Sequence, residues 1–348
     1  MKDFTKELLK SKLPKIGEIE VTLFEFCNLH CDFCFLKVND KTGITREEIF
    51  SKLDVIYDFS DSIKSNIGTI QLNMVGGELM IDAFLDDGYL DIYHDFIMEV
   101  DKWYKENGIV LRVVFVSNFL FNDNNALKIE KFIKSLRQAT GCFIGMIASY
   151  DFSGRPMNKQ WKKNLETLKD VTVSINTVMT KPGLEHLMYK GDKYWEEYLY
   201  PNFNTYFDYF IPDKGSDDMI PPDSLLLEFY KWVYDKFPKI NPINEMIDMD
   251  SGPQSMSCLS LNKITIFPDN TTSNCRWHRY DNDDFVNELD YDDNSNMVLD
   301  YVNEYNCFTC EYYTICPLRC FTQWSWKGRV RDVEGCVNKH FYDHISKG

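Results

Sequence analysis

Three cysteines stand close together near the start of the chain, in the run Cys27-Asn28-Leu29-His30-Cys31-Asp32-Phe33-Cys34. Their spacing, C-x3-C-x2-C, allows three thiolates to hold three irons of a cubane [4Fe–4S] cluster, which leaves the fourth iron without a protein ligand. An iron with an open position is a place where chemistry can occur. The run follows a strand-like segment, Glu18 to Glu25, and a β/α barrel places its reacting groups in the loops that follow its strands.

A structural zinc site is the alternative interpretation of this triplet, as are buried cysteines that are neighbours by chance. Zinc sites usually pair two C-x2-C units and close with four ligands, and a lone cysteine triplet lacks a local fourth. The spacing therefore favours an iron–sulfur cluster, although spacing alone does not identify the metal.

A second group of cysteines lies near the other end of the chain and has a C-x2-C-x5-C-x3-C centre. Its seven members are Cys258, Cys275, Cys307, Cys310, Cys316, Cys320 and Cys336. A zinc ribbon or a disulfide knot is the alternative for this group, but disulfides are disfavoured because nothing marks the chain as secreted. Ten of the 11 cysteines fall in these two groups and only Cys142 stands outside them, which indicates metal ligation.

The first run resembles the signature of the radical S-adenosylmethionine (AdoMet) superfamily, C-x3-C-x-aromatic-C, with Phe33 as the aromatic residue. The second group resembles the SPASM extension of the radical AdoMet enzymes that modify peptides. The resemblance implies that the open iron binds the amino and carboxylate groups of AdoMet. It also implies that AdoMet is cleaved reductively to a 5′-deoxyadenosyl radical, which abstracts hydrogen from a substrate.

The same resemblance implies three [4Fe–4S] clusters, one that binds AdoMet and two that are auxiliary. The first cluster would be held by Cys27, Cys31 and Cys34. The first auxiliary cluster would take Cys258, Cys275 and Cys320, and the second would take Cys307, Cys310, Cys316 and Cys336. With only three cysteines, the first auxiliary cluster can have an open iron, a different fourth ligand or a bound substrate.

One departure from the family pattern lies shortly before Cys275, where relatives usually carry a glycine. Here Asp269-Asn270 occupies the turn expected between strands at Lys263–Phe267 and Thr271–Asn274. Asparagine tolerates a positive φ better than most residues other than glycine. We therefore expect the turn to form.

Polar residues and glycines at the ends of strand-like segments are the expected AdoMet contacts. The resemblance implies that Glu78 accepts hydrogen bonds from the AdoMet ammonium. Arg155 is expected to bind the AdoMet carboxylate, which a guanidinium contacts through two parallel N–H groups. Gly76 and Gly77 would let the backbone approach a ligand closely, although Leu79 stands where the family usually has proline. An ordinary turn or helix cap is the alternative for each position. The full expected set is Phe33, Gly76, Gly77, Glu78, Ser117, Asn118, Ser149, Arg155 and Asn176.

Strand-like and helix-like segments alternate between the two cysteine groups. Six β/α units predict a parallel sheet, and the resemblance implies a partial (β/α)6 TIM-like barrel with a small cysteine-rich C-terminal SPASM domain. Strands are expected at 18–25, 69–74, 110–117, 143–149, 171–178 and 205–210. Helices are expected at 45–59, 91–107, 125–140, 159–169 and 185–199, with a further helix at 224–237 after the barrel.

Length and composition agree with a large domain and a smaller one. A chain of 348 residues exceeds the size at which one core usually stops growing. We expect an N-terminal extension at 1–18, the barrel at 19–222, a bridging helix and linker at 223–257, and the SPASM domain at 258–348. No signal peptide or membrane span is evident, so a cytoplasmic protein is expected. The net charge of −16 disfavours a nucleic-acid partner and would favour a basic peptide.

The resemblance makes modification of a peptide or protein the leading hypothesis, by cross-link, thioether, oxidation or epimerisation. A small-molecule oxidase or mutase is the second hypothesis, and a non-catalytic metal-binding interaction protein is the third. Only about eighteen residues precede the first strand, so any leader peptide is expected to bind another surface of the chain or a separate protein. A flavodoxin- or ferredoxin-type donor is expected to supply electrons.

Two further observations bear on the reaction. Arg276-Trp277-His278 argues against sulfatase maturation, in which an acid follows the cysteine that corresponds to Cys275. Cys142 is a candidate hydrogen donor, and the alternative is that it is a buried bystander.

Overall fold

A computed structural model gives the structure of the protein. It describes residues 16–34, 44–152, 155, 157–212, 215–247, 262–275 and 294–347. Cys258 and residues 276–278 lie outside these ranges. No helix within the described residues is long and apolar enough to cross a membrane.

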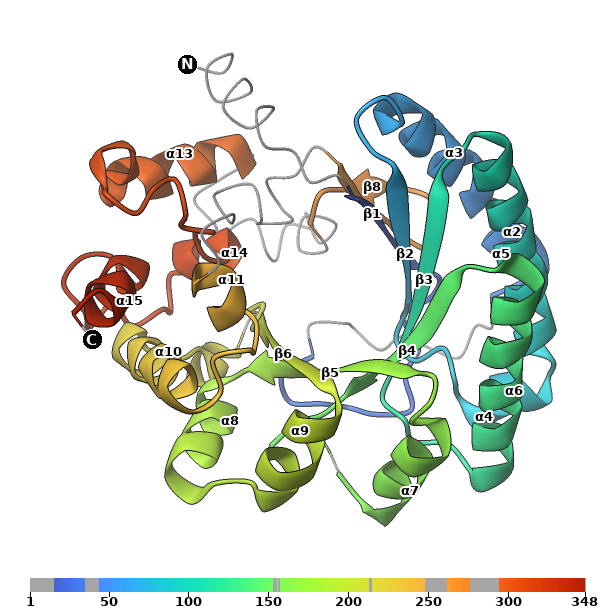
Figure 1. Cartoon of the computed structure of the whole chain (residues 1–348), viewed down its shortest axis with the longest axis horizontal. Coiled ribbons are helices and arrows are strands. Elements are labelled where there is room, and N and C mark those ends of the chain that lie inside the picture. The colour runs from blue at the N-terminus through green and yellow to red at the C-terminus, as the bar shows by residue number, and fades with distance from the viewer. Residues whose placement is uncertain are drawn as a thin grey trace.

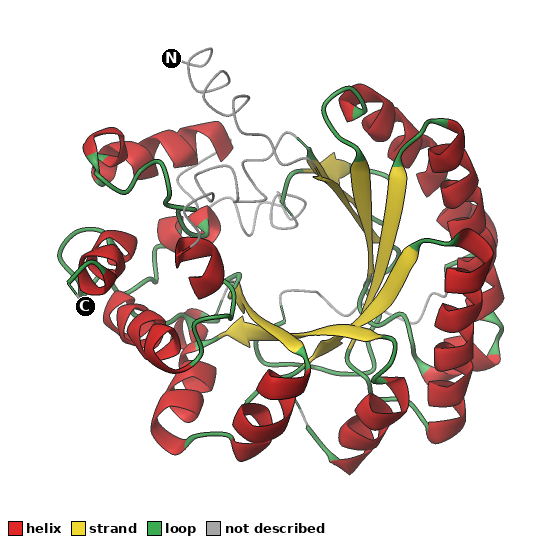
Figure 2. Ribbon diagram, viewed as in Figure 1, coloured by secondary structure: helices red, strands yellow, loops and turns green. Residues whose placement is uncertain are grey.

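A sheet of eight strands occupies the centre of the described part of the chain, in the order β6-β5-β4-β3-β2-β1-β7-β8. Strands β1 to β6 are parallel, each beside its neighbour in the sequence, and the sheet curves with helices along its outer side (Figures 1 and 2). The expected α/β fold with a parallel sheet is therefore confirmed. The strands are β1 (Ile16–Thr22), β2 (Thr69–Val75), β3 (Val110–Ser117), β4 (Phe143–Ser149), β5 (Thr172–Met179), β6 (Asn204–Tyr209), β7 (Lys263–Ile266) and β8 (Thr272–Ser273).

Helices connect the parallel strands and bury one face of the sheet. In β3, Leu111, Val113 and Phe115 alternate toward the helices and are fully buried or nearly so. The Phe115 ring contacts Tyr93 of α5 and Phe132 of α6. The helices of this layer are α2 (Arg46–Phe50), α3 (Lys52–Ile63), α4 (Asp82–Asp86), α5 (Tyr89–Glu106), α6 (Asp123–Thr140), α7 (Lys159–Leu168), α8 (Lys181–Glu185) and α9 (Tyr200–Asn202).

The helix expected at 185–199 takes a different form. The structure has α8 followed by two π-helical turns, His186–Lys190 and Trp195–Leu199. Gly191 separates them with φ 75°, a conformation that ends regular helix. Periodicity detected the buried positions there but not this interruption.

Helices of the C-terminal part lie beyond β6, and α15 packs against α10 (Figure 1). The Tyr230 ring of α10 contacts Phe341 of α15, with 5.8 Å between the ring centroids. The helix expected at 224–237 is confirmed as α10. The elements of this part are α10 (Asp223–Lys236), α11 (Ile243–Ile247), α13 (Asn294–Glu304), α14 (Phe321–Ser325) and α15 (Val337–Ile345).

The β7–β8 hairpin joins the cysteine-bearing C-terminal part to the main sheet. Strand β7 pairs in parallel with β1, and Glu18 stands opposite Lys263. The expected turn is present, and Asn270 adopts φ 67°. The buried ammonium of Lys52 donates hydrogen bonds of 2.5 Å to Pro268 O and to Asn270 Oδ1. The hairpin that leads to Cys275 is thus attached beside the strand that leads to Cys27.

We expect the substitution Asn270→Ala to lower the free energy of unfolding by about 2 kcal/mol or more, because alanine is strained at positive φ and cannot accept from the buried Lys52. Urea unfolding of the anaerobically purified protein measures this change. Asn202→Ala in α9, where the side chain is exposed, is the control and should change stability by less than about 0.5 kcal/mol. Equal stabilities of the two variants would contradict this explanation of the turn.

Candidate active site

The cysteine loop begins where the backbone after β1 pairs with the backbone after β2. Leu23 N donates to Val75 O at 3.1 Å, Gly77 N to Phe24 O at 2.8 Å, and Glu78 N to Phe26 O at 2.8 Å. Cys27 follows directly after Phe26. The Gly-Gly-Glu segment therefore fixes the point from which the three-cysteine loop departs.

Gly77 has a steric reason for being glycine. A Cβ atom at this position would lie 2.0 Å from Phe26 O, a separation that no pair of such atoms can adopt. A Cβ at Gly76 would lie 3.0 Å from Phe24 O. The sequence suggested that these glycines approach a ligand, and the structure shows that they allow the two loops to touch.

Glu78 joins the loop after β2 to the loop after β3. Its side chain is 2% exposed; Oε1 accepts from Met80 N at 2.9 Å, and Oε2 accepts from Asn118 N at 2.5 Å. Burial raises the pKa of this carboxyl, while the Asn118 and Met80 hydrogen bonds and the Arg155 guanidinium oppose the increase. The expected contact with the AdoMet ammonium stays a prediction.

Asn118 and Asn28 hold the cysteine loop against the end of β3. Asn118 Nδ2 donates to Asn28 Oδ1 at 2.7 Å and lies 3.9 Å from Cys27 Sγ. Asn28 Nδ2 donates to Leu120 O at 3.1 Å, and Leu120 N donates to Asn118 Oδ1 at 2.8 Å. Asn28 was absent from the expected set. Its place beside Cys27 was a signal that could have found it.

Ser117 belongs to the same group of contacts. It is buried, and its hydroxyl accepts from Phe119 N at 3.1 Å and hydrogen-bonds to Glu78. The structure thus brings Gly77, Glu78, Ser117 and Asn118 together around the start of the cysteine loop.

The thiols of this loop lie in surroundings suited to a bound cation. Burial raises the pKa of Cys27 to about 12, and the Glu78 carboxylate and the thiols of Cys31 and Cys34 add to the increase. Leu29 N donates to Cys27 Sγ at 3.4 Å. Three thiols on one short loop, with the backbone N–H of Leu29 on one sulfur, are the donor type that an iron–sulfur cluster takes.

Arg155 lies beside this loop with part of its guanidinium uncommitted. Its Cζ is 5.4 Å from the centre of the Phe33 ring. Nε and Nη1 are buried, and neither has a hydrogen-bond partner among the described residues. Buried donors of this kind fit a bound carboxylate.

Phe33 belongs to a small apolar cluster that joins the barrel to the C-terminal part of the chain. Cys31 and Cys275 both pack against it, so it lies between two of the expected cluster sites. Trp326 Nε1 donates to Asp217 Oδ1 at 2.6 Å, which fixes the indole ring in the cluster. The buried members are Phe33, Phe210, Met219, Ile220 and Trp326.

Ser149 ends β4 and is the register partner of Asn176 inside β5. Asn176 Nδ2 donates to Asp208 Oδ2 at 2.7 Å, and Trp161 Nε1 donates to Ser149 O. Within the described residues no hydrogen bond joins this pair to Glu78 or Asn118. Asp208 of β6 was missed because its pairing with Asn176 depends on strand register.

Four C-terminal cysteines lie close enough to interact electrostatically: Cys307, Cys310, Cys316 and Cys336. They are reduced thiols, and burial raises the pKa of Cys307 and of Cys316 to about 12. This is the set that the sequence assigns to the second auxiliary cluster. Among the described residues, no three cysteine, histidine or acidic side chains already converge as ligands of a metal ion.

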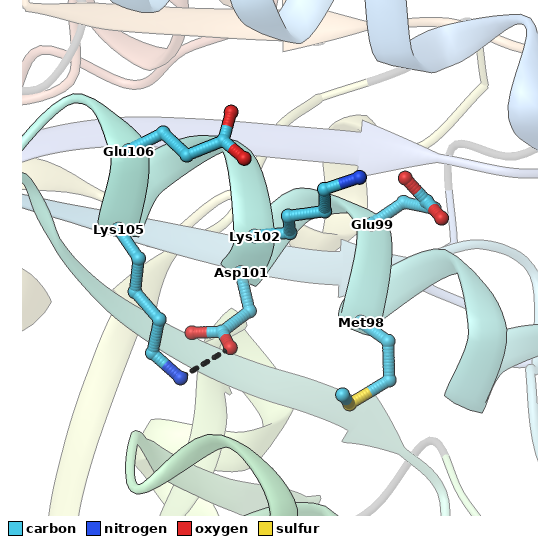
Figure 3. Close-up of a pocket in the computed structure, with 6 residues that line it drawn as sticks. All are labelled: Met98, Glu99, Asp101, Lys102, Lys105 and Glu106. Carbon is cyan, nitrogen blue, oxygen red and sulfur yellow. Dashed lines mark hydrogen bonds and ion pairs between the residues drawn. The ribbon is translucent and has the colours of Figure 1, made fainter.

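Cys142 directly precedes β4, so it lies at the amino ends of the parallel strands, whereas the cysteine loop follows the carboxyl end of β1. Its thiol donates to Asp101 Oδ1 at 3.0 Å, and its pKa rises to about 11 through burial and the Asp101 carboxylate. Asp101 also pairs with Lys105 at 2.7 Å and lines a surface pocket on α5 (Figure 3). This placement favours the bystander interpretation of Cys142.

We expect Gly77→Ala to lower the iron content by about one cluster, because the new Cβ must displace the backbone that leads to Cys27. Iron analysis and the visible absorption of the anaerobically reconstituted protein measure the loss. Gly68→Ala is the matched control, since a Cβ at that glycine meets no atom within 4 Å. Full iron loading of the Gly77→Ala variant would contradict the steric argument.

Neither protein-family models nor curated protein sequences match the chain. Solved structures do match its fold. A structure of anSMEcpe with bound AdoMet is 15% identical, with a TM-score of 0.63 over 95% of each chain. *Streptococcus suis* SuiB bound to the precursor peptide SuiA is 14% identical, with a TM-score of 0.54 over 95% of this chain and 78% of that one. The chain therefore has the same fold as anSMEcpe and SuiB.

Proposed function

We propose that the protein is a radical AdoMet enzyme that modifies a peptide or protein substrate. The observation that carries the proposal is the three-cysteine loop, which is held at the strand ends by Gly77, Glu78 and Asn118 beside the uncommitted Arg155 guanidinium. When bound, the cluster and AdoMet together supply a 5′-deoxyadenosyl radical that abstracts hydrogen from the substrate.

The residues of the chain bind and orient AdoMet in this proposal. Cys27, Cys31 and Cys34 leave one iron open for its amino and carboxylate groups. Arg155 binds the carboxylate, and Glu78 accepts from the ammonium with lone pairs beyond those its backbone donors occupy. Contacts to the ribose and to the rest of the cofactor come from Phe33, Gly76, Gly77, Ser117, Asn118, Ser149 and Asn176.

The architecture proposed with this activity is a (β/α)6 partial barrel built on β1 to β6 and a SPASM domain with two auxiliary clusters. Cys275 and Cys320, with Cys258, hold the first auxiliary cluster, and Cys307, Cys310, Cys316 and Cys336 hold the second. The apolar cluster around Phe33 and Trp326 separates the AdoMet site from the first auxiliary cluster and excludes water between them.

A peptide substrate is supported by two observations. The structural neighbours include anSMEcpe with bound AdoMet and Kp18Cys peptide, and SuiB with its precursor peptide. The net charge of −16 favours a basic partner and disfavours nucleic acid. We propose a cytoplasmic enzyme that receives electrons from a flavodoxin- or ferredoxin-type protein and works with a separate leader-binding protein. Cross-linking, thioether formation, oxidation and epimerisation are all compatible outcomes.

Replacing Cys27, Cys31 and Cys34 together by alanine should abolish 5′-deoxyadenosine formation, because no open iron remains to bind AdoMet. The assay is chromatography after incubation of the reduced, anaerobically reconstituted protein with AdoMet and candidate peptides. Cys142→Ala, at the amino end of β4, should retain the activity. AdoMet left intact by the fully loaded wild-type protein with these peptides would contradict the proposed function.

Arg155→Lys should weaken AdoMet binding by about tenfold to a hundredfold, since a lysine cannot reproduce the forked carboxylate contact. Equilibrium binding to the anaerobic, cluster-loaded protein measures the dissociation constant. Arg112→Lys is a close control, because Arg112 also lies over an aromatic ring, with Cζ 4.7 Å from the centre of Phe143. This pair lies near the amino ends of β3 and β4, away from the cysteine loop. Unchanged AdoMet affinity in the Arg155 variant would remove this residue from the site.

A further inference from the structure

The sulfur of Cys316 receives two N–H groups from the protein. Leu318 N lies 3.3 Å from Cys316 Sγ, and Asn338 Nδ2 lies 3.4 Å from the same atom. Both donors are within the distance at which N–H groups bond to sulfur. Hydrogen bonds to the sulfurs are among the factors that set the reduction potential of an iron–sulfur cluster.

Leu318 holds its N–H on the sulfur in an unusual backbone conformation. Its φ is 64°, in the left-handed region that a branched side chain such as leucine rarely adopts. Asn338, which is 1% exposed on α15, donates from Nδ2 to Leu318 O at 2.8 Å as well. One asparagine side chain therefore contacts the sulfur and also secures the strained residue that provides the second donor.

A second thiol of the group has a polar neighbour of its own. The hydroxyl of Tyr301, a buried residue of α13, lies 3.8 Å from Cys336 Sγ. Tyr301 interacts electrostatically with Cys316 and Cys307 as well. Its hydroxyl is therefore a polar neighbour of Cys336 on the buried side of this thiol group.

A group of buried charged side chains lies near Tyr301. The Arg319 and Arg329 side chains share the Asp223 carboxylate, with Arg319 Nη1 and Arg329 Nε each 3.0 Å from Oδ1. All three side chains are buried, and Asp332 acts on Arg329 from nearer the surface. Arg319 also acts on Tyr301. Asp223 and Asp332 are thus the acidic groups that face these two arginines.

We propose that Asn338 raises the reduction potential of the cluster held by Cys307, Cys310, Cys316 and Cys336, by donating to Cys316 Sγ and by keeping Leu318 N–H on that sulfur. Reduction adds one electron to the cluster, and the added negative charge strengthens both hydrogen bonds. The reduced state is thereby stabilised more than the oxidised state. This inference rests on the four-cysteine cluster of the proposed function.

Asn338→Leu tests the inference, because leucine has a similar volume and donates no hydrogen bond. The measurement is an EPR-monitored redox titration of the reconstituted full-length protein. We expect the midpoint potential of this cluster to become more negative by the equivalent of about a tenfold change in its reduction equilibrium, about 59 mV for one electron. The first auxiliary cluster in the same sample should keep its potential.

Two further variants keep the test decisive. Asn338→Ala removes the same donor with a smaller side chain, so a negative shift is expected here too. This variant decides the matter if Asn338→Leu does not load iron. Asn125→Leu on α6 is the control, because this buried asparagine donates to Asp82 rather than to a thiol, and no shift is expected. An unchanged potential in loaded Asn338→Leu, or in loaded Asn338→Ala if the leucine variant does not load, would overturn the inference.

Cys316→Ala separates this failure from failure of the cluster assignment. The variant should lose about four iron atoms per chain if the four-cysteine cluster exists. An unchanged iron content would refute that part of the proposed function. An unchanged potential with normal iron loading would refute only the role of Asn338.

Discussion

The approach of the Gly77 backbone to the Phe26 carbonyl is the constraint on which the candidate site depends. No side chain fits between the two segments, since a Cβ at Gly77 would lie 2.0 Å from Phe26 O. This contact fixes the residue before Cys27, and it places Glu78 where its carboxylate reaches Asn118 N. Asn118 in turn holds Asn28 of the cysteine loop. Three loops that follow β1, β2 and β3 are thus connected through backbone contact and a few polar side chains.

The sequence predicted the features that depend on local spacing. The cysteine groups, the alternation of strands and helices, and the turn at Asn270 follow from neighbouring residues, and Asn270 has the expected positive φ. Contacts that depend on how strands align were not accessible. Asp208 became visible only when the parallel register of β5 and β6 brought it beside Asn176. The π-helical turns on either side of Gly191 were missed because their hydrophobic periodicity resembles that of one helix.

The C-terminal cysteines are attached to the barrel at two places of different chemistry. Strand β7 extends the sheet beside β1, while Asp223 at the start of α10 binds the buried Arg319 and Arg329 side chains. The first attachment positions Cys275 near Phe33 and Cys31, and the second positions the segment that carries Cys316 and Cys320. The cysteine-bearing segments and the sheet are therefore parts of one packed structure, in which the polar contacts around the thiols are set by the fold.

The central claim is that three cysteines leave one iron open for AdoMet. The most direct measurement is the EPR spectrum of the dithionite-reduced protein in which Cys307, Cys310, Cys316 and Cys336 are replaced by alanine, recorded with and without AdoMet. The account predicts that AdoMet changes the signal of the cluster held by Cys27, Cys31 and Cys34. A signal from this cluster that is identical with and without saturating AdoMet would contradict the account.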